Sequence, residues 1–351
     1  MGDEQAARTY VRALRELTLA RVREFLREPE ALFWVFGFPV IMTIALGIAF
    51  RTRTDEPVVV GVERVAGAAA VAAALETAGG FVVRDVPAAG VERALRDGVV
   101  QVVIVPGTPP AYRFDPARAE SQVARLAVDR VLQQAAGRRD AFTPREDAVR
   151  AVGSRYIDWL VPGLLGMNIM GTGMWSTSFA IVTARTRKLL KRFAATPMPR
   201  SAYLLSFVGS RVAFLVAEGV VLVGFAWLAF DVAVHGSLAA LGVVSLVGAL
   251  AFGGIALLVA SRARTVEGVS GLLNLVMLPM WVFSGVFFAS SNFPDAMQPF
   301  VQVLPLTALN DALRGVINDG EPLARLWREL ALLTVWGGAS FAAAFRLFRW
   351  A

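Results

Sequence analysis

The sequence contains no cysteine and a single histidine, His235. Without thiols, the chain cannot form disulfide bonds, thiolate metal sites or cysteine nucleophiles. One histidine also argues against a histidine-based triad and a zinc cluster. Charged residues are scarce as well, at 18% of the chain, whereas soluble proteins average about 25%. Apolar residues reach 56%, and this composition predicts a chain embedded in a bilayer, because hydrocarbon excludes ions.

Lysine is equally rare, since the chain has only Lys188 and Lys191. Neither lysine follows a glycine, so the phosphate-binding loop G-x-x-x-x-G-K-[ST] is absent, and the G-x-S-x-G motif of serine hydrolases is absent too. We therefore expect no catalytic residue, no metal site and no cofactor in this chain. If the protein uses ATP, another chain must bind the ATP and Mg²⁺. The net charge of +7 is interpreted as topogenic charge beside apolar spans, and no nucleic-acid partner is expected.

Six stretches are apolar and close to the length of a spanning helix, which is about 20 residues. They cover residues 31–50, 158–184, 203–230, 236–260, 268–290 and 327–347. No apolar signal-peptide core precedes the first stretch, so we expect that stretch to remain as a helix. The sequence therefore predicts a membrane all-α bundle with six transmembrane helices.

Basic residues predict the orientation of these helices, because Lys and Arg in short flanks stay in the cytoplasm. They gather before the first span, in the loop 185–202, between the fourth and fifth spans, and at the C-terminus. With six spans these four regions fall on one side, so both termini are predicted to be cytoplasmic. Arg325 and Arg328 precede the sixth span on the other side and are exceptions.

Residues 51–157 are predicted to form a small extracytoplasmic α/β domain inserted after the first span. Short β-branched runs at 57–62, 81–86 and 99–106 alternate with helical patterns at 68–78 and 90–97. A further helix is expected over 117–137, with its apolar face formed by Val123, Leu126, Ala127 and Val131.

Residues 1–30 are predicted to contain an amphipathic helix with arginines on one face. Such a helix either lies in the membrane interface or leads into the membrane as a solvated helix. The loop 185–202 holds a second basic amphipathic segment, in which Lys188, Lys191 and Arg192 lie beside Phe193. This segment can dock on a partner protein or bind anionic membrane lipid.

Residues 291–320 are apolar but interrupted by prolines, and the intervals are too short to span a bilayer. We predict a re-entrant or interfacial helical hairpin on the outer side. Within it, Asn310, Asp311 and Arg314 are expected to satisfy one another at helical spacing.

Polar residues also occur inside the predicted spans. Arg211 and Glu218 lie about two turns apart in the third span, and Asn274 lies in the fifth. Such residues usually face the bundle interior or water, so the charged pair either lines a conduit or joins helices. Glu267, at the cytoplasmic mouth of the fifth span, is expected to pair with Arg262 or Arg264.

Two segments resemble the ABC-2 type exporter permeases: KLLKRFAATPMPRSAYLLSFVGSR, which is similar to the family's cytoplasmic loop, and FSGVFFASSNFPDAMQPFVQVLPLTALNDALRG, which is similar to its re-entrant region. Pro305 and Arg314 belong to the second segment. The order of elements agrees over essentially the whole chain, and the large outer domain resembles the multidrug branch.

The resemblance implies a transport subunit in the plasma (inner) membrane of a bacterium, which moves an amphipathic, drug-like or lipid-like molecule out of the cytoplasm or the inner leaflet. It implies a second permease chain, identical or related, and two copies of an ATPase subunit. The residues implied in ATPase coupling are Arg185, Arg187, Lys188, Lys191, Arg192 and Phe193.

Two other classes of protein stay open on the residues alone. An ion-coupled secondary transporter would use Glu218 as its coupling carboxylate, although no inverted repeat is visible. A membrane receptor or scaffold would bind a ligand with its outer domain, although six spans with charges inside exceed what an anchor needs.

Overall fold

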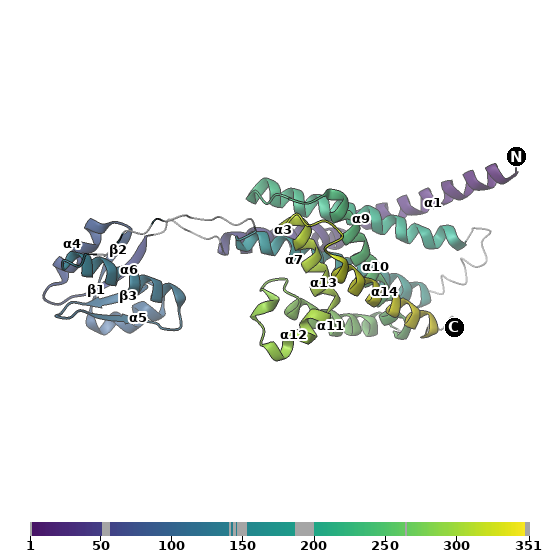
Figure 1. Cartoon of the computed structure of the whole chain (residues 1–351). Helices are drawn as coiled ribbons and strands as arrows, with labels where there is room; N and C mark the ends of the chain where they lie inside the picture. Colours follow the sequence, from purple (N-terminus) through teal and green to yellow (C-terminus); the bar gives the residue numbers. More distant parts are fainter. Residues whose placement is uncertain are drawn as a thin grey trace. The chain divides into compact units, whose positions relative to one another are not determined.

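The computed structural model describes residues 2–50, 57–139, 142, 145, 153–186, 200–263 and 265–347. Two compact units make up the chain (Figure 1). The helical unit consists of Met1–Thr52 and Arg150–Ala351, and the α/β unit consists of Arg53–Val149.

The helical unit consists mainly of long helices, with several short ones between them. One long segment runs through α2 (Pro29–Leu32), a π-helical turn η1 (Phe33–Gly37) and α3 (Phe38–Ala49). The other long helices are α1 (Gly2–Leu26), α7 (Tyr156–Thr186), α9 (Arg200–Phe230), α10 (Leu238–Arg262), α11 (Val266–Phe283) and α14 (Trp327–Leu347). Between α11 and α14 lie α12 (Gln298–Val303) and α13 (Pro305–Ile317).

Five helical stretches among the described residues are long and apolar enough to cross a membrane, and the chain is a multi-pass membrane protein. They are Pro29–Ala49, Gly209–Phe230, Leu238–Arg262, Val266–Phe283 and Trp327–Leu347. The predicted span 158–184 lies in α7, which has 31 residues but is less apolar because it includes Asn168 and Thr172. Most of α7 is buried among α3, α9, α10, α11 and α13, and Asn168 and Thr172 face other helices (Figure 1).

The predicted fifth span, 268–290, was too long. Helix α11 ends at Phe283, where Ser284 still donates its N–H to the carbonyl of Met280. Gly285 then adopts a φ of +70°, a left-handed conformation that ends a helix and that glycine adopts without strain. The following chain forms two short 3-10 turns (Ser290–Asn292 and Asp295–Met297) before α12 and α13.

Helices α10 and α14 approach each other backbone to backbone. A Cβ placed on Gly254 would lie 2.7 Å from the carbonyl oxygen of Gly337, and one on Gly337 would lie 2.9 Å from the Cα of Ala251. Small residues permit such close approach, which replaces the hydrophobic effect as the source of helix association in lipid.

Helix α1 runs beside α9. The ring centroids of Phe25 and Phe214 are 4.4 Å apart, and Thr18 packs on Gly209, whose missing side chain leaves room for it. The apolar side of the predicted amphipathic helix therefore meets protein along this stretch.

The α/β unit contains a four-stranded sheet in the order β2-β1-β3-β4, formed by β1 (Val58–Glu63), β2 (Phe81–Val86), β3 (Val102–Val105) and β4 (Ala111–Phe114). The first three strands are parallel, with Val60 opposite both Val83 and Val102, and β4 pairs antiparallel with β3. Helices α4 (Ala68–Ala78) and α6 (Ala119–Ala135) pack on one face, and α5 (Val91–Arg96) packs on the other. The sequence did not predict β4, which has only four residues.

The predicted apolar face of α6 was wrong for Val123 and Leu126, whereas Val131 does pack against the sheet. Val123 and Leu126 are exposed, at 64% and 57% of their surface, whereas Ala124 and Val128 are buried against the sheet. Apolar residues lie on more than one face of α6, so the sequence alone does not decide which face is buried. In the structure, contact with Val60 and Ile104 buries the face that contains Ala124 and Val128.

Candidate functional site

A cluster of polar groups joins α7 and α9 inside the helical unit. Arg211 and Glu218 are seven residues apart in α9 and therefore lie on one face, and Arg211 Nη1 is 3.1 Å from Glu218 Oε1. The Glu218 side chain is fully buried, whereas that of Arg211 retains 18% of its exposure. We call Asn168, Thr172, Arg211 and Glu218 the α7–α9 polar cluster.

Arg211 reaches across to α7 with both terminal nitrogens. Nη1 donates to the hydroxyl of Thr172 at 2.7 Å, and Nη2 donates to the carbonyl of Ile169 at 2.9 Å. The Thr172 hydroxyl in turn donates to the carbonyl of Asn168 at 2.7 Å. The ion pair of α9 is therefore bound to α7 by hydrogen bonds, as buried charges require.

The polar cluster also extends to the segment that runs from α2 to α3. Asn168 Nδ2 donates to the carbonyl of Val35 at 2.9 Å, and Val35 lies within the π-helical turn. A π turn inserts an extra residue, which disturbs the regular carbonyl pattern and occurs often at functional sites. One chain of hydrogen bonds thus connects three helical segments.

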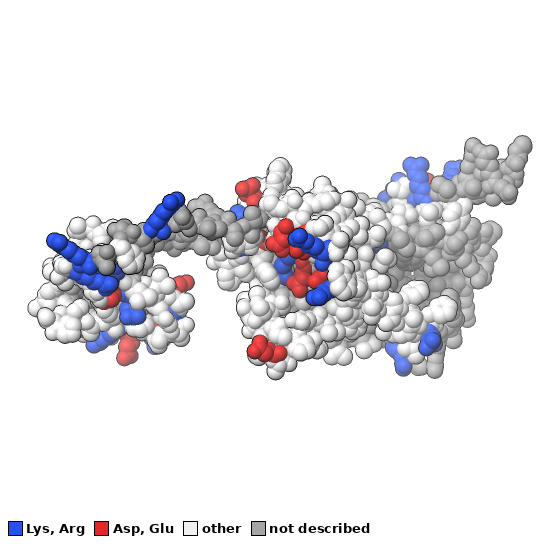
Figure 2. Space-filling view, viewed as in Figure 1, with Lys and Arg blue, Asp and Glu red and all other residues white. Residues whose placement is uncertain are grey.

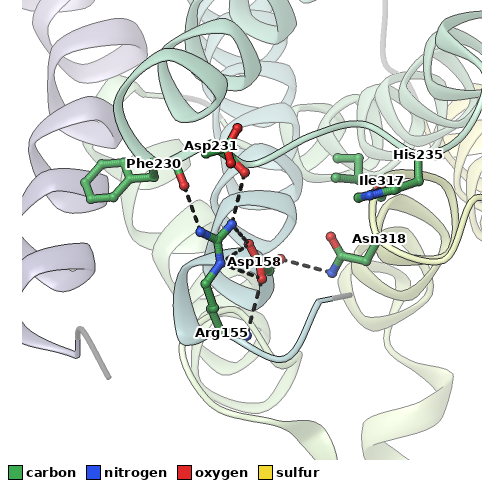
Figure 3. A network of polar contacts seen from close by, with 7 residues as sticks. All are labelled: Arg155, Asp158, Phe230, Asp231, His235, Ile317 and Asn318. Atoms are coloured by element: carbon green, nitrogen blue, oxygen red, sulfur yellow. Dashed lines mark hydrogen bonds and ion pairs between the residues drawn. The ribbon is translucent and has the colours of Figure 1, made fainter. Parts of the chain in front are cut away.

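A second polar network lies where α7 begins and α9 ends (Figure 3). Arg155 forms an ion pair with Asp158 at 2.7 Å, and its terminal nitrogens donate to the carbonyls of Phe230 at 3.0 Å and Asp231 at 3.1 Å. These carbonyls at the end of α9 lack partners within the helix, and a cation beside them also complements the helix dipole. Hydrogen bonding to Asp158 raises the pKa of Arg155 above its ordinary value, so the guanidinium stays charged.

The Arg155 network continues to α13. Asn318 Nδ2 donates to the carbonyl of Asp158 at 3.0 Å, and the backbone N–H of His235 donates to the carbonyl of Ile317 at 2.9 Å (Figure 3). Hydrogen bonds therefore connect the ends of α7, α9 and α13.

Figure 2 shows that the charged side chains of the helical unit gather in a few areas of the side in view and leave wide uncharged surfaces between them.

Arg314 lies in the nearly completely buried helix α13. Its guanidinium stacks 3.4 Å from the ring centroid of Trp159, donates to the carbonyl of Gly285, and lies 3.5 Å from Asp311. Asp311 itself is half-exposed. The charge of Arg314 is therefore balanced by several groups together: the Asp311 carboxylate, the carbonyls of Trp159 and Gly285, and the Trp159 ring.

Asn310 does not join Asp311 and Arg314, contrary to the prediction. Its Nδ2 donates to the carbonyl of Ser284 at 2.8 Å, and its Oδ1 packs directly on Gly166 of α7. Successive residues of a helix point about 100° apart, so Asn310 faces the end of α11 while Asp311 faces away. Pro305 begins α13, where its missing N–H leaves no bond unmade.

Arg185, predicted to contact an ATPase, binds the chain's own α10. Its Nη1 donates to the carbonyls of Ala260 at 3.2 Å and Ala263 at 2.8 Å, at the C-terminal end of that helix. A guanidinium here satisfies carbonyls that have no partner within the helix. The other predicted coupling residues, Arg187, Lys188, Lys191, Arg192 and Phe193, lie outside the described residues.

The two remaining candidates are exposed on α11. Glu267 lies in the first turn of α11, and within the described residues it forms no ion pair with Arg262; Arg264 is not described. A carboxylate in this turn complements the helix dipole instead. Asn274, in the middle of α11, points away from the rest of the helical unit.

Sequence reasoning missed Asn168, Thr172, Arg155, Asp158 and Asn318. Asn168 and Thr172 carry a recognisable signal, because polar residues four apart in an apolar helix lie on one face. Arg155 and Asp158 carry a local signal too, as opposite charges three residues apart, but their contacts with Phe230, Asp231 and Asn318 join residues that are distant in sequence. The described residues contain no group of three His, Asp or Glu side chains suited to a metal ion.

Comparison with known proteins identifies relatives. The family model for "ABC-2 type transporter" matches residues 125–318, slightly more than half of the chain. Nodulation protein J of Bradyrhizobium diazoefficiens is 28% identical over 57% of this chain and 76% of its own length. The inner membrane transport permease YadH of Escherichia coli is 21% identical over 46% of this chain and 63% of its own length. ABC transporter G family member 20 of Dictyostelium discoideum is 26% identical over 52% of this chain. The match covers 25% of the length of that protein.

Proposed function

Because the chain belongs to the ABC-2 type transporter family, we propose that this permease subunit exports an amphipathic, drug-like or lipid-like molecule, and that a separate ATPase subunit drives the export. The observation that carries the proposal is the extent of the family match. Residues 125–318 include α7, α9, α10, α11 and α13, together with the basic loop between α7 and α9.

The charges inside the helical unit support a substrate without a strong charge of its own. Arg211 is bound to Glu218, and Arg314 is balanced by Asp311, carbonyls and Trp159. A strongly ionic substrate would need an opposite charge on its pathway, because ions are costly in a low-dielectric medium. These two arginines already have partners, so they favour an amphipathic molecule.

The same arrangement disfavours Glu218 as an ion-coupling carboxylate. A coupling group must exchange protons or cations with water, whereas the Glu218 side chain is fully buried and bound to Arg211. Energy from a separate ATPase fits this geometry better, and the sequence holds no phosphate-binding loop.

In the proposed assembly, two permease chains form the pathway in the bacterial inner membrane, and two ATPase subunits bind on the cytoplasmic side. Both termini are cytoplasmic, and the α/β unit lies outside. Helix α7 is the second span in chain order and brings the five candidate spans to six, and the segment containing α12 and α13 is re-entrant. The loop that holds Lys188, Lys191 and Arg192 docks on the ATPase. Arg185, near the end of α7, anchors that end to α10.

Charge reversal in the loop tests this proposal. The variant K188E/K191E/R192E should lose the ATP-hydrolysing subunit during co-purification, because repulsion replaces attraction at the docking surface. The control is R93E/R96E in the α/β unit, where both arginines are highly exposed. That control should retain the ATPase. Full assembly and transport by the loop variant would contradict the proposed coupling role.

A further inference from the structure

A group of charged side chains lies where α13 meets the start of α14. It includes Arg325 and Arg328, the two arginines that depart from the orientation predicted by the other basic residues. Its carboxylates are Asp311 in α13, Glu321 in the chain that connects the two helices, and Glu329 in the first turn of α14. We call these five residues the α13–α14 charged patch.

The packing around Gly315 of α13 holds the connecting chain against that helix. A Cβ added to Gly315 would lie 2.8 Å from the Leu326 side chain and 3.2 Å from a carboxylate oxygen of Glu321. The N–H of Glu321 also donates to the carbonyl of Gly315 at 2.7 Å. Arg325 directly precedes Leu326, so this contact also places Arg325 beside α13.

The carboxylates of the patch have few partners among the described residues. Asp311 lies 3.5 Å from Arg314, whereas neither Glu321 nor Glu329 forms an ion pair there. The charges of Asp311 and Glu329 are close enough to repel each other. Glu329 is half-buried, and its Oε2 accepts no hydrogen bond within the described chain. A cation that donates hydrogen bonds would stabilise this arrangement.

The arginines of the patch also lack carboxylate partners. Arg325 and Arg328 are exposed, and within the part of the chain that the structure describes neither forms an ion pair. The guanidinium of Arg328 lies 5.5 Å from the ring centroid of Trp327, which is 61% exposed. Tryptophan at the start of a spanning helix is typical of the headgroup region of a membrane. Phosphate is the group that guanidinium binds best in that region.

The exposed face of α14 beyond the patch is suited to a hydrocarbon chain. Ala331, Val335, Gly338 and Ala342 follow Arg328 at helical spacing and are all exposed. A Cβ added to Gly338 would meet no atom within 4 Å. An acyl chain can therefore lie along this face while its headgroup stays at the patch. This continuity favours a membrane lipid over a soluble molecule with the same polar groups.

We propose that the α13–α14 charged patch binds a phospholipid whose headgroup carries both a phosphate and a primary ammonium, as phosphatidylethanolamine does. The phosphate binds Arg325 and Arg328, and the ammonium binds Glu329 and Asp311. The proposal rests on the proposed function for its orientation, which places the start of α14 at the outer leaflet. A headgroup with only negative charge fits less well, because its phosphate would be repelled by the carboxylates of the patch.

The lipid preference of the purified whole permease tests this proposal. Native mass spectrometry in detergent measures the binding of added phosphatidylethanolamine, phosphatidylcholine or phosphatidylglycerol. Phosphatidylcholine has the same net charge, but its quaternary ammonium has no N–H to donate, and phosphatidylglycerol has no ammonium. We expect phosphatidylethanolamine to bind about three- to tenfold more tightly than either lipid, the effect of one charge-assisted hydrogen bond at a partly exposed site.

The ammonium contact is tested by E329Q, which removes the charge and keeps the size of the side chain. This variant should bind phosphatidylethanolamine and phosphatidylcholine about equally. The matched control is E267Q, since Glu267 is an exposed carboxylate in the first turn of α11. E267Q should keep the preference of the unmodified chain.

The phosphate contact is tested by R325Q/R328Q, which should weaken the binding of all three lipids about three- to tenfold. The control R262Q/R346Q removes the same amount of charge from exposed arginines in the last turns of α10 and α14. It should leave the binding of all three lipids unchanged.

Three outcomes would overturn the proposal: equal binding of phosphatidylethanolamine and phosphatidylcholine by the unmodified chain, tighter binding of phosphatidylglycerol, or a preference that survives in E329Q. The leaflet is tested separately, because the chain has no cysteine to compete with an introduced thiol. R325C should react with a membrane-impermeant maleimide added outside spheroplasts. Reaction only in inverted vesicles would place the patch at the cytoplasmic leaflet and overturn the assignment to the outer one.

The failure of this lipid site is distinguishable from failure of the proposed function. If the lipid preference is absent while the ATPase subunit still co-purifies with the chain, only the α13–α14 charged patch is wrong. If no ATPase subunit associates with the unmodified chain, the proposed function itself is wrong.

Discussion

Arg211 and Glu218 form an ion pair whose arginine is shared between two helices. The 3.1 Å contact lies within α9, yet the same guanidinium donates to Thr172 and to the Ile169 carbonyl of α7. The pair therefore fixes the position of α9 on α7, and it does so with groups that are costly to separate.

Removing Glu218 alone should be more harmful than removing both charges. E218L leaves Arg211 buried without its carboxylate, and we expect it to cost about 3–5 kcal/mol of unfolding free energy. R211L/E218L should cost less than E218L, because neither charge is left behind. Tryptophan fluorescence during denaturation in detergent measures both, with the exposed V216A as control. A loss for R211L/E218L equal to the sum of the losses for R211L and for E218L would contradict the shared pairing.

The Arg155 network predicts a local effect at the end of α9. R155A removes donors to the carbonyls of Phe230 and Asp231 as well as the partner of Asp158. With nearly half of the Arg155 side chain exposed, we expect a loss of about 1–2 kcal/mol.

Hydrogen–deuterium exchange should accelerate at the last turn of α9 and at the start of α10 in R155A. R155K should recover only part of the protection, because an ammonium cannot reproduce the fork of donors. R346A, in the last turn of α14, is the matched control. Unchanged exchange in R155A would show that water replaces the guanidinium without cost.

Arg185 should act on the permease itself rather than on the ATPase. R185A leaves the carbonyls of Ala260 and Ala263 without their donor, and we expect the purified permease alone to lose about 1–2 kcal/mol of stability. R262A removes a nearby exposed arginine and should have little effect. A stable R185A protein that fails only to bind the ATPase would restore the direct coupling role.

Tyr112 predicts a pH dependence in the α/β unit. Partial burial and the 3.0 Å hydrogen bond to Asp129 raise the pKa of Tyr112 to about 12, from an ordinary value of 10.0. Folding therefore favours the protonated phenol, and the resulting stability is present below pH 10 and is lost as the pH rises toward 12. In Y112F this loss should be absent.

The ultraviolet difference between the unmodified chain and Y112F isolates the ionisation of Tyr112 from that of the other tyrosines. Its midpoint should lie near pH 12 while the protein stays folded. A midpoint near the ordinary value of 10.0 would mean that neither burial nor Asp129 affects the phenol.

Sequence reasoning succeeded where a signal is local. Long apolar runs predicted the five stretches that the structure shows as candidate spans, and β-branched runs located β1, β2 and β3. The spacing of seven between Arg211 and Glu218 is two helical turns, and this alone predicts that the two side chains share one face. Each of these signals depends only on neighbours within a few turns of the chain.

The failures came from partners distant in sequence. Asn310 binds Ser284 rather than Arg314, and Arg185 binds the end of α10, because tertiary packing brings those carbonyls close. Val123 and Leu126 formed a plausible apolar stripe on α6, but the sheet selected the stripe with Ala124 and Val128. No local pattern distinguishes these alternatives.

The contact between Gly254 and Gly337 has a mechanical consequence. With a carbonyl of one helix against the Cα region of the other, neither α10 nor α14 can roll about its axis without a backbone clash. We therefore expect α10 and α14 to move together as one rigid body. A change of access during transport must then occur at the contacts that this pair makes with other helices, among them those of α10 with α7, α9 and α11.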